Sequence, residues 1–284
     1  MKRLTIEEKA AKFSQLHEAG CFVLPNAWDA PSAMLACEAG FDAVGTTSAG
    51  VALAHGFADG ERIGRARMLA VAGSIAHRLP VPVTADLEAG YGPAPEDVAA
   101  SVRAAIDAGI VGCNIEDTDP RKGELFDLGS GAARIRAGAR AARDAGLTNF
   151  VLNARIDTFF VGTGSTEERV AESIRRAHAY LEAGARCVFV PGPVDAATIG
   201  ALVKGVGGPL NVWGGVGDHI VPIETLRALG VRRVSLGAGP MLATYAVAKR
   251  LFQSARQGSD DGVTFEGAGS MFGELTGLMQ KYHE

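Results

Sequence analysis

The chain has 284 residues, of which 47% are hydrophobic and 21% are charged, and its formal net charge at pH 7 is -4. This composition is typical of a soluble globular protein that is long enough for one large domain or two small ones. The acidic balance and the scattered basic residues argue against nucleic acid as the main partner.

The first nine residues carry several charges and lack the apolar segment of a secretory signal. No stretch of the sequence has the length and apolarity that a membrane span needs. The four cysteines, Cys21, Cys37, Cys113 and Cys187, have neither C-x-x-C spacing nor nearby histidine ligands. We therefore expect a reduced, cytoplasmic protein with no membrane partner.

Helix-like and strand-like segments alternate along the chain. In chain order, helices are predicted at 5–20, 31–39, 62–78, 95–108, 131–145, 166–183, 195–204 and 222–229. Strands are predicted between them at 21–25, 41–47, 81–86, 110–115, 150–154, 187–191, 210–213 and 233–237. Residues 118–130 are expected to form a polar loop.

The predicted strands are continuously apolar, which indicates burial on both faces, as in a parallel sheet. Eight strand–helix units in about 240 residues predict an α/β fold, the (β/α)8 TIM barrel. A doubly wound open sheet is the alternative, but the count of eight and the absence of G-x-G-x-x-G after the first strand disfavour it. We expect one barrel domain over 1–284, with 239–284 as a C-terminal helical extension broken by a glycine-rich segment around 258–270.

The segment 83–92 begins as an apolar, β-branched strand and ends in two acids followed by Gly-Tyr-Gly. Residues two apart on an extended strand point the same way, so Asp86 and Glu88 are expected to project together. Paired carboxylates suit a shared hard cation, Mg2+ or Mn2+. Taken alone, such a pair is more often two solvated loop acids. The residues at the other strand ends are therefore needed to choose between a metal site and solvated acids.

In a TIM barrel the chemistry belongs at the C-terminal ends of the strands. The residues predicted there are Asn26, Trp28, Asp29, Thr47, Ser48, Gly50, Asp86, Glu88, Glu116, Asp117, Arg155, Asp157, Asn211 and Ser235, with Asp59 in the loop after the second strand. Charged side chains are rarely buried unpaired, so their convergence on one rim indicates a site. We expect a divalent cation held by Asp86, Glu88 and Glu116, with some contacts through water.

Arg155 is expected to face these acids from the fifth strand. It can grip a substrate carboxylate in bidentate fashion, or it can form a structural ion pair with one of the acids. The backbone N–H groups of residues 48–50 open a helix or turn and can hold a second anion.

Five segments stand in order along nearly the whole chain: 46–52 (Thr-Thr-Ser-Ala-Gly-Val-Ala), Asp59, 85–92 (Ala-Asp-Leu-Glu-Ala-Gly-Tyr-Gly), 114–117 (Asn-Ile-Glu-Asp) and 153–157 (Asn-Ala-Arg-Ile-Asp). Together they resemble motifs of the isocitrate lyase/phosphoenolpyruvate mutase superfamily. These motifs are the substrate-binding S-G-G segment, an aspartate after it, the metal motif D-x-D/E-x-G-[FY]-G, and the I-E-D and A-R-x-D motifs. Ala49 replaces the first glycine of the S-G-G segment.

The resemblance implies a Mg2+-dependent enzyme, with Mn2+ as a possible substitute, that binds small 2-oxo or 2-hydroxy carboxylates and stabilises an enolate beside the metal. It implies metal ligands at Asp86, Glu88 and Glu116, catalytic roles for Arg155 and Glu116, and a substrate-binding set of Thr47, Ser48, Ala49, Gly50, Asp59, Arg155 and Asn211. Members usually assemble as tetramers that exchange a C-terminal helix. We therefore expect a homo-oligomer, dimer or tetramer, built with residues 239–284.

Two departures narrow the expected reaction. Isocitrate and methylisocitrate lyases carry K-[KR]-C-G-H in the loop after the fourth strand, whereas residues 118–126 here contain no cysteine. The mutase and phosphonopyruvate hydrolase branches carry a histidine after the sixth strand, where this chain has 190–193 (Val-Pro-Gly-Pro). What remains resembles a 2-oxo-acid lyase or decarboxylase. Lys122 and Glu124 are candidates for its acid and base, unless they are solvated lid residues.

Three other functions stay open. The missing histidine disfavours carbon–phosphorus chemistry of the mutase or hydrolase type but leaves it as an alternative. Glycine pairs at 214–215 and 237–239 resemble phosphate-binding loops of other barrels, which would suggest a phosphosugar enzyme but would leave the acids unexplained. The chain could also be a catalytically silent binding protein of the same fold.

Overall fold

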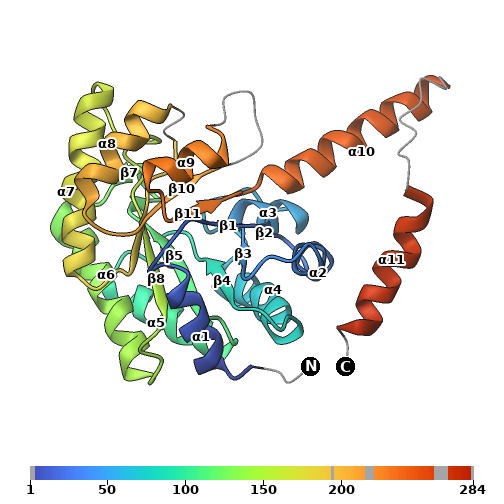
Figure 1. Ribbon diagram of the computed structural model, residues 1–284, viewed down its shortest axis with the longest axis horizontal. Helices are drawn as coiled ribbons and strands as arrows, with labels where there is room; N and C mark the ends of the chain where they lie inside the picture. Colours follow the sequence, from blue (N-terminus) through green and yellow to red (C-terminus); the bar gives the residue numbers. More distant parts are fainter. Residues whose placement is uncertain (1–3, 193–194, 215–220, 259–267, 283–284) are drawn as a thin grey trace.

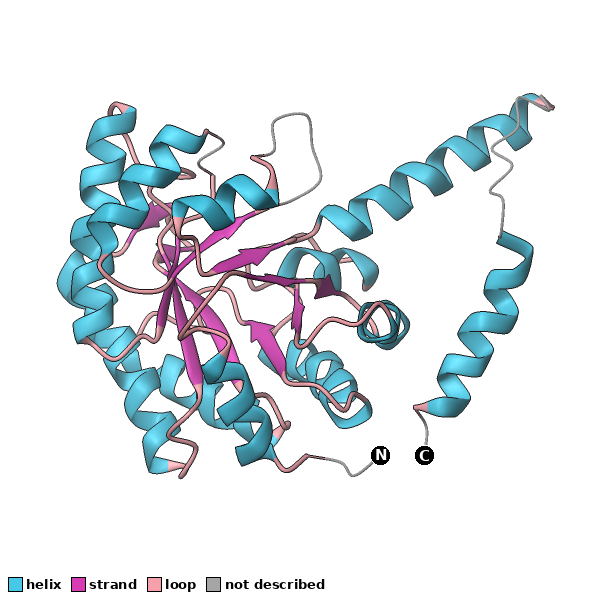
Figure 2. Ribbon diagram, in the orientation of Figure 1, coloured by secondary structure: helices cyan, strands magenta, loops and turns pink. Residues whose placement is uncertain are grey.

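All but two of the described strands form one parallel sheet that curls into a barrel with helices around it (Figures 1 and 2). The structure is a computed structural model that describes residues 4–192, 195–214, 221–258 and 268–282. Within that part of the chain the strand order is β1-β11-β10-β9-β8-β5-β4-β3-β2. The bounds are β1 Phe22–Leu24, β2 Asn26–Ala27, β3 Val44–Thr46, β4 Val83–Asp86, β5 Gly112–Glu116, β8 Val151–Arg155, β9 Cys187–Phe189, β10 Leu210–Trp213 and β11 Arg233–Ser235.

The two ends of this order, β1 and β2, are halves of one extended segment interrupted at Pro25. Proline has no N–H to give to a sheet ladder, so the pairing changes partner there. The first half pairs with β11 and the second half with β3. The nine strands therefore act as eight, and the predicted TIM barrel is confirmed.

The helices begin and end close to the predicted positions. Their bounds are α1 Ile6–Gln15, α2 Ala30–Glu38, α3 Ser48–Ala54, α4 Arg65–Arg78, α5 Pro95–Asp107, α6 Leu128–Asp144, α7 Thr166–Glu182, α8 Ala196–Val206, α9 Ile223–Leu229, α10 Gly239–Gln257 and α11 Ala268–Lys281. Local chemistry explains several starts: Thr5 and Asp29, for example, cap α1 and α2 with side-chain oxygens that accept backbone N–H bonds.

Two segments differ from the prediction. The helix expected at 5–20 ends at Gln15, and Gly20 lies beyond it with φ +72°. The loop expected at 118–130 contains a short antiparallel hairpin, β6 (Thr118–Asp119) with β7 (Glu124–Leu125), and α6 already begins at Leu128. Asp127 explains that early start, because its carboxylate accepts the N–H of Ser130 and caps the helix.

Helix α1 closes the N-terminal end of the barrel. The rings of Phe13, His17 and Phe22 pack edge to face there, with centroids 4.9 to 6.3 Å apart. Phe13 and His17 are buried. This end, which we call the floor, is thus a packed aromatic layer.

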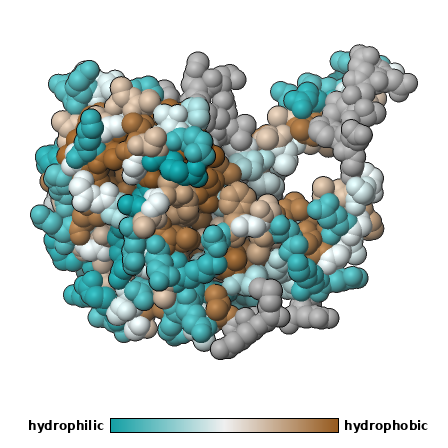
Figure 3. Space-filling model, in the orientation of Figure 1, coloured by the Kyte–Doolittle hydropathy of each residue, from teal (hydrophilic) through white to brown (hydrophobic). Residues whose placement is uncertain are grey.

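Helix α10 runs away from the barrel and α11 turns back toward it (Figure 1). The second helix is fastened to α2 by Glu38, whose Oε1 lies 2.7 Å from Lys281 Nζ and 2.6 Å from the Tyr282 hydroxyl. Figure 3 shows the molecule hollowed between these helices and the barrel. Large apolar side chains are exposed on both helices, namely Leu242, Tyr245, Leu251, Phe252, Met271 and Phe272.

Most of the predicted glycine-rich break lies outside the described residues, since only 258 and 268–270 are described. Among the described helices, none combines the length and the apolar character needed to cross a bilayer.

Candidate active site

Asp86 ends β4 at the C-terminal mouth of the barrel. Its Oδ2 accepts hydrogen bonds from the Ser48 hydroxyl, at 2.8 Å, and from the Ser48 N–H, at 3.2 Å. Its own N–H donates to Thr46 Oγ1 over 3.0 Å. The other oxygen, Oδ1, is buried and has no hydrogen-bond partner within the described structure. Because an unpaired buried oxygen is costly, Oδ1 is the atom that a cation would satisfy.

The segment 48–50 forms the start of α3, as expected. Thr47 caps this helix by accepting the N–H of Gly50 at 3.4 Å, and Gly50 is needed because a Cβ there would lie 2.5 Å from Thr47 Cγ2. The N–H groups of Ser48 and Gly50 are therefore both bonded within the protein. The anion-binding role predicted for this segment, including Ala49, stays a prediction.

Glu88 lies on a tight turn after β4, so the extended geometry predicted for residues 86–88 is wrong. The strand ends at Asp86, and Glu88 has a left-handed φ of +51°. Its Oε2 accepts a hydrogen bond from the N–H of Glu61, and its Oε1 lies 3.5 Å from the Tyr91 hydroxyl. The turn still brings Glu88 beside the other acids. Burial, followed by the charge of Asp59, raises the pKa of Glu88 to about 7.

Arg155 ends β8 and forms the ion pair that the sequence left open as its alternative role. Its Nη1 lies 2.8 Å from Glu116 Oε2, and its Nε lies 2.7 Å from Asp157 Oδ1. The paired register of β5 and β8 sets Glu116 directly beside Arg155. Despite the cost of burial, the two carboxylates hold the pKa of Arg155 above its usual value.

Side chains of α7 support the ion pairs of Arg155 through a further layer of charged contacts. The sequence analysis did not predict this layer. Asp117 Oδ1 accepts the N–H of Asp157 at 2.9 Å. Its Oδ2 accepts from Arg176 Nη1 at 3.0 Å and from the Tyr180 hydroxyl at 2.9 Å. Burial raises the pKa of Asp117 to about 6. The i,i+4 spacing of Arg176 and Tyr180 on a helix was the available signal, but nothing in the sequence named their partner.

Several acids share the mouth, among them Asp59, Asp86, Glu88 and Glu116. Burial raises the pKa of Glu116 well above its usual range, and Asp86 and Glu88 add to that effect while Arg155 opposes it. The surrounding protein and the charge of Asp86 likewise raise the pKa of Asp59, although its side chain reaches solvent. Like charges crowded in this way favour a bound cation.

Within the described part of the chain, no three His, Cys, Asp or Glu side chains stand in a geometry that would hold a metal ion by themselves. The donor set therefore fits a cation that takes few protein carboxylates directly and keeps several waters, as Mg2+ does. Asp86, whose Oδ1 has no partner in the described part of the chain, is the best-placed direct ligand, and Glu88 and Glu116 would act beside it.

Two predicted site residues have no hydrogen bond or ion pair to this cluster among the described residues. Asn211 is fully buried within β10, where its Oδ1 accepts the Ser235 hydroxyl at 3.1 Å and its Nδ2 has no partner among the described residues. Glu124 is exposed on the β6–β7 hairpin and lines a cavity of about 250 Å3 together with Arg169 and Glu172. Their predicted roles in binding and catalysis stay predictions, as does that of the exposed Lys122.

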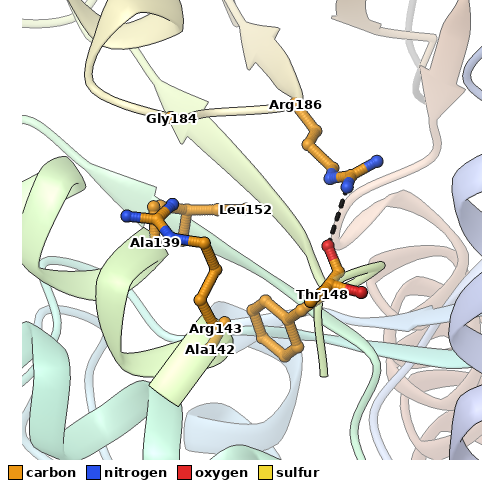
Figure 4. A pocket seen from close by; sticks show the side chains of 8 residues that line it. Ala139, Ala142, Arg143, Thr148, Leu152, Gly184 and Arg186 are labelled. Carbon is orange, nitrogen blue, oxygen red and sulfur yellow. Dashed lines mark hydrogen bonds between the residues drawn. The ribbon is translucent and has the colours of Figure 1, made fainter. Parts of the chain in front are cut away.

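Of the glycine pairs that suggested a phosphate site, Gly215 lies outside the described residues, as does Pro193 in the segment after the sixth predicted strand. A separate cavity of about 190 Å3 lies at the opposite end of the barrel (Figure 4). There Arg186 donates to the Thr148 carbonyl at 2.7 Å and to the Ser14 hydroxyl at 2.9 Å. Arg186 thus ties α1 to the barrel, which makes this cavity part of the floor.

Fold and mouth together define a TIM-barrel protein with a carboxylate-rich site at the C-terminal ends of its strands. The chain belongs to the phosphoenolpyruvate phosphomutase family, whose model matches residues 13–256. This places it in the phosphoenolpyruvate mutase/isocitrate lyase superfamily and confirms the resemblance seen in the motifs.

Two relatives cover most of the chain. An uncharacterized protein of Mycobacterium tuberculosis is 38% identical over 238 residues, which is 83% of this chain and 86% of the relative. The chloroplastic carboxyvinyl-carboxyphosphonate phosphorylmutase of Arabidopsis thaliana is 31% identical over 264 residues, which is 88% of this chain and 74% of the relative.

Solved structures agree with this placement. A protein of Burkholderia cenocepacia J2315, provisionally described as a phosphonomutase, is 41% identical with a TM-score of 0.81 and covers 89% of this chain and 100% of its own. Oxaloacetate acetylhydrolase in complex with oxalate is 27% identical with a TM-score of 0.84, over 97% of both chains. The 2,3-dimethylmalate lyase is 26% identical with a TM-score of 0.80, over 99% of this chain and 97% of its own. The named members are thus lyases, mutases and a hydrolase.

Proposed function

We propose that this protein is a Mg2+-dependent carbon–carbon lyase or decarboxylase that acts on small 2-oxo or 2-hydroxy carboxylates. The observation that carries the proposal is Oδ1 of Asp86, which has no hydrogen-bond partner among the described residues and lies among acids of raised pKa within the electrostatic reach of Arg155. A divalent cation, with Mn2+ as a substitute, would relieve the crowded negative charge and let an anionic substrate enter.

Arg155 would hold one carboxylate of the substrate. Its contacts with Glu116 and Asp157 use Nη1 and Nε, so Nη2 is the nitrogen that an incoming carboxylate would meet. The same contacts fix the plane of the guanidinium before substrate arrives, which lowers the entropy cost of binding. When bound, Mg2+ would stabilise negative charge as it develops on the 2-oxygen of the substrate.

Relatives support a dicarboxylate substrate. One structural neighbour is described with its product oxalate and acts on oxaloacetate, and another is a 2,3-dimethylmalate lyase. Both names describe chemistry at a carbon–carbon bond next to a carboxylate. The hairpin over residues 118–125 carries no cysteine, and decarboxylation needs only an electron sink. If the reaction needs an acid and a base instead, Glu116 is the half-buried candidate, and Glu124 and Lys122 on the hairpin are the exposed ones.

Carbon–phosphorus chemistry is the second candidate, because the family model and the Arabidopsis relative are named for phosphomutases. The segment 190–192 provides Val-Pro-Gly and no histidine that would meet a phosphoryl group. Phosphonopyruvate conversion therefore belongs in the same assay as the carboxylic acids.

The test is release of pyruvate or oxalate, or formation of phosphoenolpyruvate, from a panel containing oxaloacetate, substituted malates and phosphonopyruvate, with Mg2+ and with a chelator. Asp86→Ala should lower kcat/KM by at least about 10³-fold, because it removes a charge that acts in the transition state. Asp144→Ala, which removes an exposed acid at the end of α6, is the matched control and should leave turnover unchanged. Absence of turnover across the panel, or full activity of Asp86→Ala, would refute the proposal.

A further inference from the structure

Glu61 links two segments of the mouth that are far apart in sequence. One is the loop after α3, which carries Asp59 two residues earlier. The other is the turn at 87–92, which carries Glu88. The N–H of Glu61 donates to Glu88 Oε2, and Glu61 Oε1 accepts the N–H of Tyr91. Glu61 therefore contacts both the side chain of Glu88 and the backbone that positions it.

The opposite side of the same turn is held by groups from two helices. Arg134 of α6 donates to the carbonyls of Gly92, at 2.8 Å, and Ala89. Ser101 of α5 donates to the carbonyl of Gly90 at 2.7 Å. These donors fix the carbonyl side of the turn, so Glu61 supplies the contacts on the side that faces the acids.

This arrangement imposes backbone strain. Glu61, Glu88 and Tyr91 have φ of +64°, +51° and +63°, and within the described chain no other non-glycine residue has a positive φ. Left-handed backbone is unfavourable for residues with a Cβ but not for glycine. A glycine at position 61 would remove its share of the strain, and it would also lose the carboxylate that accepts the Tyr91 N–H.

We propose that Glu61 is a positioning residue that couples the Asp59 loop to the turn of Glu88, so that both carboxylates are presented to one divalent cation. The inference rests on the proposed function, because it assumes a cation bound at Asp86. Glu61 acts through hydrogen bonds to Glu88 and Tyr91 and contributes no ligand atom of its own. The acceptor oxygen, not the negative charge, is the part that matters.

The experiment is a titration of the metal-free protein with Mn2+, in which electron paramagnetic resonance measures the concentration of free Mn2+. Glu61→Gly should weaken Mn2+ binding by at least about tenfold, as loss of a residue that orients a ligand does. Its Tm without metal should equal or exceed that of the unsubstituted protein, because strain is relieved. Glu61→Gln keeps an acceptor oxygen and should bind Mn2+ within about threefold of the unsubstituted protein.

Hydrogen exchange gives a readout that needs no metal. The Tyr91 N–H should exchange faster in Glu61→Gly and at its original rate in Glu61→Gln. Unchanged Mn2+ affinity in Glu61→Gly would overturn the inference, and so would equal weakening in both variants, since the acceptor alone is meant to suffice.

Asp86→Ala, titrated in parallel, separates the two proposals. If it abolishes Mn2+ binding while Glu61→Gly binds normally, the inference about Glu61 fails and the proposed metal site stands. If Asp86→Ala binds Mn2+ as tightly as the unsubstituted protein, the metal site at Asp86 fails and takes the role of Glu61 with it.

Discussion

Ionisable groups at the mouth of this barrel and at its floor have contrasting surroundings. At the mouth, carboxylates are crowded together, the pKa of Glu88 rises to about 7, and Asp86 Oδ1 has no partner among the described residues. At the floor, burial and then the charge of Arg233 lower the pKa of His17 to about 3, so this ring stays neutral among aromatic rings. The comparison teaches that the mouth carries unfavourable charge suited to ligands, whereas the floor supplies packing that stabilises the fold.

The largest expected effect is a loss of stability caused by a substitution at the floor. Phe13→Ala removes a fully buried ring and should lower the free energy of unfolding by about 3–5 kcal/mol. Turnover per folded molecule should not change if the two ends are independent. Denaturant unfolding and activity measured on the same sample give both values. Leu4→Ala, at a partly exposed side chain before α1, is the control and should cost less than about 0.5 kcal/mol. A large loss of specific activity in Phe13→Ala would show that the ends are coupled.

The next effect is at the mouth. Arg155→Lys keeps the charge but loses the planar fork, so a substrate carboxylate should lose about 1.5–3 kcal/mol of binding and KM should rise about 10- to 100-fold. Steady-state kinetics on the accepted substrate measure this. Arg175→Lys alters an exposed arginine paired with Glu172 on α7 and should leave KM unchanged. An unaltered KM in Arg155→Lys would mean that the arginine serves only its ion pairs with Glu116 and Asp157.

The smallest expected effect concerns how the free energy of unfolding depends on pH. The pKa of His17 is about 3 when folded and about 6.5 when unfolded, so between these values the unfolded chain binds more protons. This contribution to stability is therefore lost as pH falls, by about 2 kcal/mol between pH 6.5 and pH 5. Acids with raised pKa, such as Glu88, have the opposite sign over that range and gain stability as pH falls.

Replacing His17 by Gln removes the titrating ring and should flatten that part of the profile. The measurement is denaturant unfolding of both proteins at pH 5 and pH 6.5, read as the difference between them. Parallel profiles would mean that His17 is protonated in the folded protein and would contradict its lowered pKa.

The sequence predicted most of the fold because continuous apolar strands and glycine-ended helices have clear patterns. It left open whether residues 48–50 begin a helix or a turn, because Ser48–Ala54 consists mainly of small residues with no polar face. It missed the β6–β7 hairpin because its strands are two residues long. Hairpins this short are set by local hydrogen bonds, such as Gly123 N–H to the Asp119 carbonyl, more than by hydrophobic period.

The site was predicted unevenly for a physical reason. Asp86, Glu116 and Arg155 end strands, so a barrel necessarily places them on one rim. Supporting groups such as Arg134 and Arg176 come from helices, and their partners depend on how those helices pack. Glu61 depends on a left-handed backbone that no residue pattern announces. Strand ends can therefore be read from sequence, whereas the groups that orient them require coordinates.

The exposed aromatic rings of helices α10 and α11 have a consequence for thermal stability. Phe252 of α10 and Phe272 of α11 are 75% and 82% exposed, and removing such rings from water is favourable. We expect a second copy of the chain to cover them, in line with the dimer or tetramer proposed from the sequence. By mass action, the melting temperature of this protein should then rise with its concentration. A titration in concentration alone, with no substitution, would thus reveal assembly.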